Sequence, residues 1–561
     1  MAGRKSGEEL KSRHRLWLLT ILALVGVLIV ALVSCGEETT TTTTAAVTTS
    51  TSTTVSTGPT ETTASTETTT TVPQPVAGGK FVAIIQALPQ VLGYYPETGP
   101  GDQLGLTPGM ERLARLSPER QLVPVLAESW EEDAQALKVT IHLRRGVMFH
   151  DGTSLTASVA KWNFELYKET GKLMWSNYVD SFEVVDDTTL VVHLNNWNNL
   201  VLRCILDAPM LSQEAFERNG IEWARTNFVG TGPFKLKEFN RDQNMIWVKN
   251  PDYWGKDQGL PYLDEVQLLY LSDMNTAKAA MEGKEADAWT GADSQMLSEM
   301  KSKGFPLQGN WAGLYGLLIP NLVDESSPVH DQRVREAIEY AIDREAMAEA
   351  LGYGMSIPCY EMAPPGEFGA GGAKVKREYN PEKAKQLLAE AGYPNGCPID
   401  LLAMVQAGGR NSTAEAVKGY LDAAGFQTNL DIADAGRFYG SAFGTGWKDL
   451  ILGFYGVAYG QTDFNDLTNF WSQYNAAFVP WSKWKATPDL AKLFDEGLML
   501  QDPEALKKKC EEIIDVFAQK TLAIPMLYTP SRAVLQPWVH TDVFLASLTD
   551  WDWAHTWVEA H

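Results

Sequence analysis

The chain has 561 residues, too many for one small core and enough for two or three lobes. Hydrophobic residues make up 44% and charged residues 21%, as in ordinary globular proteins, and the 18 tryptophans suit a cleft that holds its ligand by stacking. The formal net charge of −23 gives a surface that repels nucleic acid and does not attract anionic lipid, so the composition argues against both kinds of partner.

The amino terminus has the pattern of an export signal. Five basic residues precede an apolar run from Leu16 to Val33, which would span roughly 27 Å as a helix, almost the thickness of a bilayer core. The run ends in Leu32-Val33-Ser34-Cys35, which resembles a bacterial lipobox. Residues 1–34 are then a lipoprotein signal peptide and Cys35 is acylated; the alternative is an uncleaved signal anchor. Both place the remaining chain outside the cytoplasm.

Residues 35–78 are dominated by threonine, with serine, proline and scattered glutamate. They hold too few large apolar side chains to offset the entropy of ordering, so we expect a disordered tether. It would keep a globular body close to the outer face of the cell membrane, or in the periplasm if a second membrane is present.

Four cysteines follow the tether, and none has the spacing of a zinc or redox motif. In an oxidising compartment two of them, Cys359 and Cys397, could pair because they flank one helical region. The alternative is that all four are buried free thiols, namely Cys204, Cys359, Cys397 and Cys510.

In the first half of the globular body, the residue pattern predicts strands with few helices between them. The segment KFVAIIQA predicts a strand at 80–87, and alternating apolar residues predict a strand at 138–143. A hairpin is expected at 182–194, and turn residues at 149–153 precede a helix that begins near Thr156. His142 and His193 lie on these strands, and we interpret them as sheet residues. Further on, we expect a strand from Phe234, a helix over 276–281 that ends at Gly283, and a strand after Ala286.

The second half alternates helices with strands. An apolar face repeats over 333–351, which predicts one helix, and further helices are expected at 380–392, 413–424 and 489–512. Strands are expected at 399–402 and 523–527. Such alternation is typical of α/β folds.

The amino-acid sequences of several segments resemble the motifs of one protein family. Residues 126–157, LAESWEEDAQALKVTIHLRRGVMFHDGTSLTA, resemble the first signature of the extracellular solute-binding proteins of family 5, the peptide, nickel and oligosaccharide receptors of ABC importers. Ser158 and Val159 stand where many members carry acids. Further resemblances are Gly230–Phe234 (GTGPF), Asn250–Gly255 (NPDYWG), Pro261–Val266 (PYLDEV) and VREAIEYAIDREAM from Val334.

The resemblance implies an α/β, two-lobed periplasmic-binding-protein fold of the large peptide-binding type (cluster C). We expect lobe I at 79–318 with an extra subdomain at about 105–230, lobe II at 319–529, and a return to lobe I at 530–561. Two chain crossings near 318 and 528 would form a hinge, and the lobes would close around a solute without chemistry.

In peptide-binding relatives an aspartate pairs with the ammonium group of the peptide, but here its place falls near Ala458. An acid-anchored amino terminus is therefore in doubt, and aromatic and neutral polar groups become the candidates. Arg410 could hold a carboxylate, or it could be a solvated arginine; the aromatics could equally belong to the core or the surface. The candidate ligand-binding residues are Tyr94, Tyr95, Trp175, Trp311, Tyr315, Arg410, Phe454, Tyr455, Tyr459, Gln461 and Trp471.

We expect a monomeric substrate-binding lipoprotein that delivers peptides or peptide-like solutes to an ABC permease, with no catalytic residue, cofactor or metal. An oligosaccharide receptor of the same family is the alternative. From other classes come a secreted glycan-degrading enzyme with paired carboxylates and an adhesin on a stalk. With 70 acidic residues a chance pair is certain, and the body carries no nucleophile elbow, zinc motif or phosphate loop.

Overall fold

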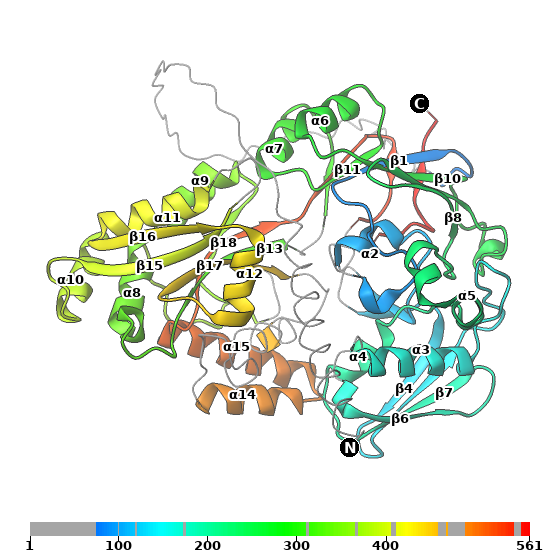
Figure 1. Ribbon diagram of the computed structural model, residues 1–561, viewed down its shortest axis with the longest axis horizontal. Coiled ribbons are helices and arrows are strands. Elements are labelled where there is room, and N and C mark those ends of the chain that lie inside the picture. Colours follow the sequence, from blue (N-terminus) through cyan, green and yellow to red (C-terminus); the bar gives the residue numbers. More distant parts are fainter. Residues whose placement is uncertain are drawn as a thin grey trace, which may run out of the picture.

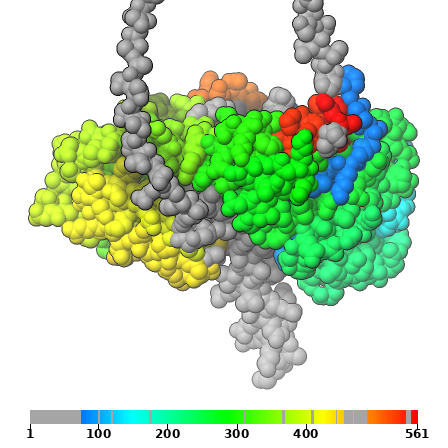
Figure 2. All heavy atoms as spheres, turned by 90° about the horizontal axis from the view of Figure 1, so that it is seen from above, coloured from blue at the N-terminus to red at the C-terminus, as the bar shows by residue number. Residues whose placement is uncertain are grey.

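The structure is a computed structural model that describes residues 74–98, 100–117, 121–171, 176–309, 313–364, 369–405, 411–457, 467–468, 488–543 and 551–560. Two lobes lie side by side (Figure 1), and the view from above in Figure 2 shows the same arrangement. We call the part built on a six-stranded sheet lobe II and the remainder lobe I. The mixture of sheets and covering helices confirms the α/β class.

Lobe I is built on a seven-stranded sheet in which β1 runs parallel to its two neighbours. Phe81 and Ile85 of β1 belong to the apolar cluster on one face, and Ile84 belongs to the cluster on the other face. The strand is thus buried on both sides, which accounts for its continuous apolar run from Phe81 to Ile85. In order across the sheet the strands are β12 (Leu307–Gln308), β19 (Ala533–Leu535), β11 (Ala288–Thr290), β1 (Lys80–Ile85), β10 (Glu265–Tyr270), β9 (Asn244–Lys249) and β8 (Phe234–Asn240).

A separate antiparallel sheet of four strands forms the lower part of lobe I in Figure 1. The expected hairpin is confirmed, and the Asp186 carboxylate accepts from the Thr188 N–H (2.8 Å) at its turn. His142 and His193 are in register with Thr189 and Lys138 and are sheet residues, as predicted. The strands are β4 (Ala127–Asp133), β5 (Lys138–Leu143), β7 (Thr189–Leu194) and β6 (Val179–Val184), with helices α3 (Ala157–Glu169), α4 (Val201–Leu206) and α5 (Gln213–Thr226).

Shorter elements complete lobe I. Among them, α6 ends where Gly283 caps it, as the sequence predicts. They are α2 (Pro100–Leu106), β2 (Ala114–Leu116), β3 (Leu122–Pro124), α6 (Met274–Glu282), α7 (Ser294–Ser302), β20 (Val539–His540) and β21 (Trp557–Val558).

Lobe II contains the six-stranded sheet with helices over both faces. Successive residues of β13 show this: Leu317 and Ile319 belong to the cluster beneath α14 and α15, and Leu318 to the cluster beneath α8, α10 and α11. The strands in order are β14 (Ile357–Pro358), β18 (Ile524–Pro530), β13 (Gly313–Pro320), β17 (Leu450–Val457), β15 (Cys397–Met404) and β16 (Phe426–Ala433). The helices are α8 (Gln332–Ala341), α9 (Arg344–Gly352), α10 (Pro381–Glu390), α11 (Ser412–Ala423), α12 (Ala435–Gly440), α14 (Pro488–Leu498) and α15 (Pro503–Lys520).

Two helices that the sequence predicts as continuous are broken, and those predictions are wrong. At 333–351 the chain leaves the helix at Ile342 (φ −98°, ψ 118°), and the Asp343 carboxylate then accepts from the Ala346 N–H (2.9 Å) to begin α9. At 489–512 the Asp502 carboxylate caps α15 in the same way, with Pro503 in its first turn. Aspartate caps of this kind compete with helix continuation, because the carboxylate accepts from the first free N–H groups of the new helix.

Between described strands, the chain passes from one lobe to the other twice, after β12 and after β18. Near these passages a Cβ atom on Gly309 would lie 2.2 Å from the Ser531 carbonyl oxygen. The two segments therefore run against each other with no room for a side chain. The domain boundaries predicted at 318 and 529 stay a prediction.

The four cysteines of the described body are free thiols, so the possible Cys359–Cys397 disulfide is not formed. Cys359 lies in the cluster beneath α14 and α15, whereas Cys397 lies in the cluster on the opposite face of the sheet. Burial raises the pKa of the Cys359 and Cys397 thiols to about 12.

No helix within the described ranges is long and apolar enough to cross a membrane, and the predicted apolar run and Cys35 lie outside those ranges.

Candidate functional site

The turn at 149–153 is fixed to the glycine-rich segment at 230–232. The backbone N–H of His150 donates to the Gly230 carbonyl (2.8 Å), and the Gly230 N–H donates to Nδ1 of the ring (3.3 Å). Because Nδ1 accepts, Nε2 carries the proton and donates to the Gly232 carbonyl (3.1 Å). Burial lowers the pKa of this neutral imidazole to about 4. Hydrogen bonds thus hold together the two segments at 149–153 and 230–232, both of which carry the family resemblance.

Asp151 connects the same turn to helix α5. Its Oδ1 accepts from the Thr153 N–H (3.0 Å), and its Oδ2 accepts from the Ser212 hydroxyl (2.7 Å). The Ser212 oxygen in turn accepts from the Ala215 N–H (3.1 Å) and caps α5. The turn therefore sets the start of α5 and does not present its carboxylate to a ligand.

Glu111 is a buried carboxyl inside lobe I. Its Oε1 accepts from the Tyr253 hydroxyl (3.0 Å) and from Nε1 of Trp254 (3.0 Å), both in the segment that resembles NPxYW. The Arg144 guanidinium stacks 4.2 Å from the centre of the Trp254 ring. Burial raises the pKa of Glu111 to about 7. A carboxyl closed off in this way joins two elements and is not available to substrate.

The second resembling segment, from Val334, also holds the fold together. Arg335 donates to the Thr521 (2.9 Å) and Lys520 (2.7 Å) carbonyls, and so caps the carboxyl end of α15. Arg344 donates to the Pro525 carbonyl (2.8 Å), which attaches α9 to β18. Both guanidiniums are almost fully buried. The charged residues of this segment act as internal connectors.

Tyr94 and Tyr95 lie in the packing of lobe I. Tyr94 is buried and stacks on Phe216 of α5 with ring centres 5.8 Å apart. Tyr95 contacts the edge of Tyr167 at 5.2 Å. The neighbouring aromatics account for both positions, and a role in ligand binding stays a prediction for each.

Tyr315 lies in lobe II at the centre of a row of three tyrosines. Along β13 it is in register with Tyr455 of β17 on one side and with Tyr528 of β18 on the other. The Tyr315 and Tyr528 rings lie 5.2 Å apart at an interplanar angle of 55°. Tyr315 and Tyr528 are both buried in the cluster beneath α14 and α15, so these two rings lie on that face of the sheet. Tyr528 was not a candidate from the sequence, and only its pairing with Tyr315 identifies it.

Of the other candidates, Phe454 lies on β17, and the rest fall outside the described residues. These are Trp175, Trp311, Arg410, Tyr459, Gln461 and Trp471, together with Ala458. The structure thus brings Tyr315 and Tyr455 together at the backbone level and places Tyr94 and Tyr95 elsewhere, in lobe I.

Arg532 is a further residue that sequence reasoning missed. It follows β18 where the chain returns to lobe I, and its side chain runs beside the Gly309 backbone. Burial lowers the pKa of its guanidinium. Its place beside both chain passages makes it a candidate for contact with a ligand held between the lobes.

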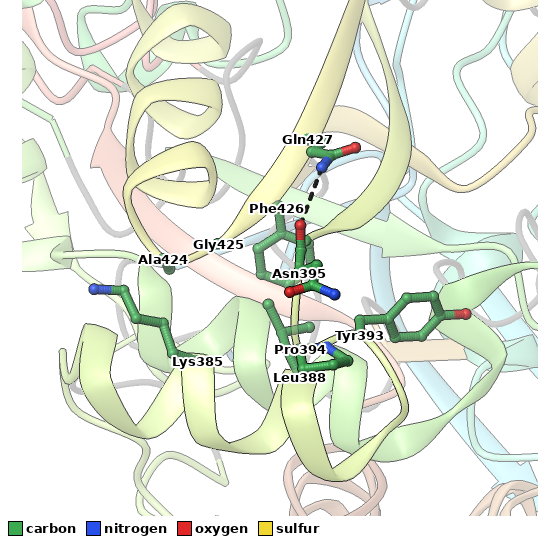
Figure 3. A pocket seen from close by; sticks show the side chains of 10 residues that line it. Lys385, Leu388, Tyr393, Pro394, Asn395, Ala424, Gly425, Phe426 and Gln427 are labelled. Carbon is green, nitrogen blue, oxygen red and sulfur yellow. Dashed lines mark hydrogen bonds between the residues drawn. The ribbon is translucent and has the colours of Figure 1, made fainter.

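A pocket of about 390 Å³ lies beside α10 in lobe II (Figure 3). It opens between the ends of α10 and α11, and the Gln427 side-chain amide bridges its wall to the Asn395 carbonyl (3.4 Å). Its floor is the core residues Leu388 and Phe426, and no candidate residue from the sequence lines it. It is separate from the passage between the lobes.

Within the described ranges, no group of three or more His, Cys, Asp or Glu side chains could hold a metal ion.

Comparison with known proteins gives one consistent result. The family model described as bacterial extracellular solute-binding proteins, family 5 Middle, matches residues 121–481. A relative named glutathione-binding protein GsiB, from Salmonella choleraesuis, is 28% identical over 442 residues, which covers 74% of this chain and 82% of that protein.

Solved structures agree in fold. The periplasmic binding protein DppA from Helicobacter pylori, in complex with the peptide STSA, superposes with a TM-score of 0.72 at 21% identity, covering 86% of this chain and 99% of that one. The binding protein AgaA from A. tumefaciens R10, in complex with agropinic acid, gives a TM-score of 0.70 at 24% identity over 86% and 99% of the two chains. These superpositions confirm the two-lobed binding-protein fold.

Proposed function

The chain belongs to the bacterial extracellular solute-binding proteins of family 5, and from that premise we propose that it is a lipid-anchored receptor that captures peptides or peptide-like solutes between its lobes and delivers them to a membrane permease. Members of this family are receptors of ABC importers and not enzymes. The alternative of a secreted glycan-degrading enzyme is therefore withdrawn, and the stalked adhesin has no support in the comparisons.

The observation that carries the proposal is the way the lobes are joined. Two adjacent chain segments pass between them, after β12 and after β18, and Gly309 packs there against Ser531 without a side chain. A joint of two adjacent segments lets two rigid bodies rotate while each keeps its own core. Rotation would bring groups from both lobes onto a solute, which then favours the closed form.

The ligand-contacting groups belong to this proposal. Tyr315, Tyr455 and Tyr528 share one level of the lobe II sheet, and Arg532 stands at the passage to lobe I. Stacking on aromatic rings with neutral hydrogen-bonding groups suits a solute without a free ammonium end, such as a modified peptide. An oligosaccharide would use the same groups, and so it remains the second candidate.

Native mass spectrometry of the purified body, residues 79–561, tests the solute class directly. A co-purified mass that fragments into amino acids supports the proposal, and a hexose ladder supports the oligosaccharide receptor instead. Thermal shift against glutathione, the peptide STSA and a panel of oligosaccharides provides the independent measurement, because a solute that binds only the native state raises the unfolding midpoint.

The predicted role of Arg410 has a matched control. Arg410→Ala should weaken binding of peptides that carry a free carboxylate and leave their amides unaffected. Arg437→Ala removes an arginine of the same lobe that already pairs with Asp431 (2.7 Å to each carboxylate oxygen). Equal effects of the two substitutions would remove Arg410 from the site.

The anchor is tested separately. Cys35→Ser in the full chain should abolish labelling by a fatty-acid analogue and release the protein from the membrane fraction. If the variant stays in the membrane fraction, the apolar run at 16–33 is an uncleaved anchor instead.

A further inference from the structure

One contact joins the lobes away from the chain passages. The loop between β7 and α4 belongs to lobe I, yet the backbone N–H of Asn199 donates to the Leu498 carbonyl (2.9 Å) at the end of α14. Its side-chain Nδ2 donates to the Gly497 (2.7 Å) and Leu500 (3.0 Å) carbonyls. Figure 1 places α4 and the end of α14 at the lower side of the molecule, whereas the passages lie above them.

These bonds add donors from lobe I to the end of α14, where the Gly497 carbonyl also accepts from the Leu500 N–H (3.2 Å). The last carbonyls of a helix have no partner within it and carry the negative end of the helix dipole. Asn199 supplies donors to this end from the other lobe. In the described part of the chain, α14 thus has a carboxyl-terminal cap that lobe I provides.

The next residue reinforces the contact. Leu200 is 3% exposed and belongs to the lobe II cluster that contains Phe494 and Leu498 of α14. Its neighbour Val201 belongs to the cluster of the four-stranded sheet in lobe I. Adjacent residues therefore enter the cores of different lobes, and any movement that separates the lobes must withdraw one of them into water.

The loop is built to present these two residues. Asn198 is fully buried, and its Oδ1 accepts from the Leu200 N–H (2.9 Å) and the Val201 N–H (3.0 Å). This fixes the turn and the start of α4 together. The loop therefore holds Asn199 and Leu200 in place before contact with lobe II.

We propose that Asn199 and Leu200 form an interlobe latch, a pair of positioning residues that stabilise the closed arrangement and slow the release of solute without touching it. This rests on the proposed function, since it assumes that the lobes close on a solute. The coupling is energetic: contacts that are lost when the lobes separate raise the apparent affinity for any ligand that prefers the closed form.

Asn199→Asp is the sharpest test because it keeps the size of the side chain. It replaces two donated hydrogen bonds with a carboxylate that faces two carbonyls and the negative end of α14. Asn196→Asp is the matched control: it adds the same charge in the same loop, where the exposed Asn196 side chain only accepts from the Trp197 N–H (2.9 Å). Asn199→Ala provides a second variant without added charge, should Asn199→Asp fold poorly.

Two measurements decide the matter. In small-angle X-ray scattering of the purified full body, Asn199→Asp and Asn199→Ala should increase the radius of gyration, and Asn196→Asp should not. With glutathione and the peptide STSA as probes, the dissociation rate should rise about tenfold, as expected for two lost hydrogen bonds, with an unchanged association rate.

The outcomes separate this inference from the proposed function. If the wild type binds a probe and all variants release it at the wild-type rate with unchanged scattering, the latch is refuted and the receptor stands. If the wild type binds no peptide and no sugar, the proposed function fails, while scattering alone still reports whether Asn199 holds the lobes together. A larger radius in Asn196→Asp as well would also refute the latch, because charge in the loop would explain the opening.

Discussion

Replacing Glu111 with glutamine should stabilise the protein at alkaline pH. Burial raises the pKa of Glu111 to about 7 in the folded chain, from 4.5 in an exposed glutamate. Between these values the unfolded chain releases the proton and the folded chain keeps it. The free energy of unfolding therefore falls as pH rises, by up to about 1.4 kcal/mol per pH unit, and the loss is complete above the folded pKa.

The whole effect amounts to about 3 kcal/mol, the difference between the two pKa values multiplied by that slope. Glu111→Gln keeps an oxygen that can accept from Tyr253 and Trp254, as Oε1 does at 3.0 Å from each donor. The variant should thus match the wild type near pH 4 and exceed it by about 3 kcal/mol near pH 8. No proton is released from a glutamine, so its stability should not decline over this interval.

Urea unfolding followed by tryptophan fluorescence, from pH 4 to pH 8.5, measures the difference between wild type and variant. Glu339→Gln is the contrast: burial also raises the pKa of Glu339, but this carboxylate accepts from the Arg377 guanidinium (2.8 Å). There glutamine weakens a buried ion pair and should cost about 2 kcal/mol at pH 7. Parallel curves for wild type and Glu111→Gln across the pH range would refute the reasoning, because Glu111 would then titrate alike in both states.

Three further outcomes follow from the contacts. His150 is neutral when folded, with a pKa of about 4 against 6.5 when exposed, so stability should be complete above pH 6.5 and fall by about 3 kcal/mol as pH drops through the folded value. His150→Asn should remove this acid dependence in urea titrations, at a cost of about 2 kcal/mol at pH 7 from lost hydrogen bonds; an unchanged acid slope would contradict it. The thiols of Cys359 and Cys397 should react with Ellman's reagent only on unfolding, because both are buried with pKa values raised to about 12; rapid labelling of the native protein would show otherwise. Asp343→Ala should lower the free energy of unfolding by about 1 kcal/mol through loss of the α9 cap, and Asp343→Asn should restore most of it.

Local patterns in the sequence predicted much of the secondary structure. The alternation at 138–143, the hairpin at 182–194 and the stop of α6 at Gly283 depend on neighbours in the chain, and all three are confirmed. The breaks at Ile342 and before Pro503 were visible as Asp343 and Asp502, but the apolar periodicity on either side outweighed them. A capping residue within an apolar repeat can end one helix and begin another, which periodicity alone does not reveal.

The candidate site was less predictable. Tyr94 and Tyr95 are aromatic residues in a loop rich in glycine and proline, yet their partners Phe216 and Tyr167 come from distant helices. Tyr528 became a candidate only when the strand order was known, because it pairs with Tyr315 from more than two hundred residues away. The cysteines show the same limit: Cys359 and Cys397 are close in sequence but lie on opposite faces of one sheet.

The sequence by itself determined the family, the α/β class and the order of most elements, because these depend on motifs and on apolar spacing within short segments. Only the tertiary structure showed that His150 joins two of those motifs, that β18 lies beside β13, and that Asn199 of one lobe caps α14 of the other. Contacts of this kind join elements that are far apart in the chain. They depend on three-dimensional proximity, which spacing along the chain does not contain.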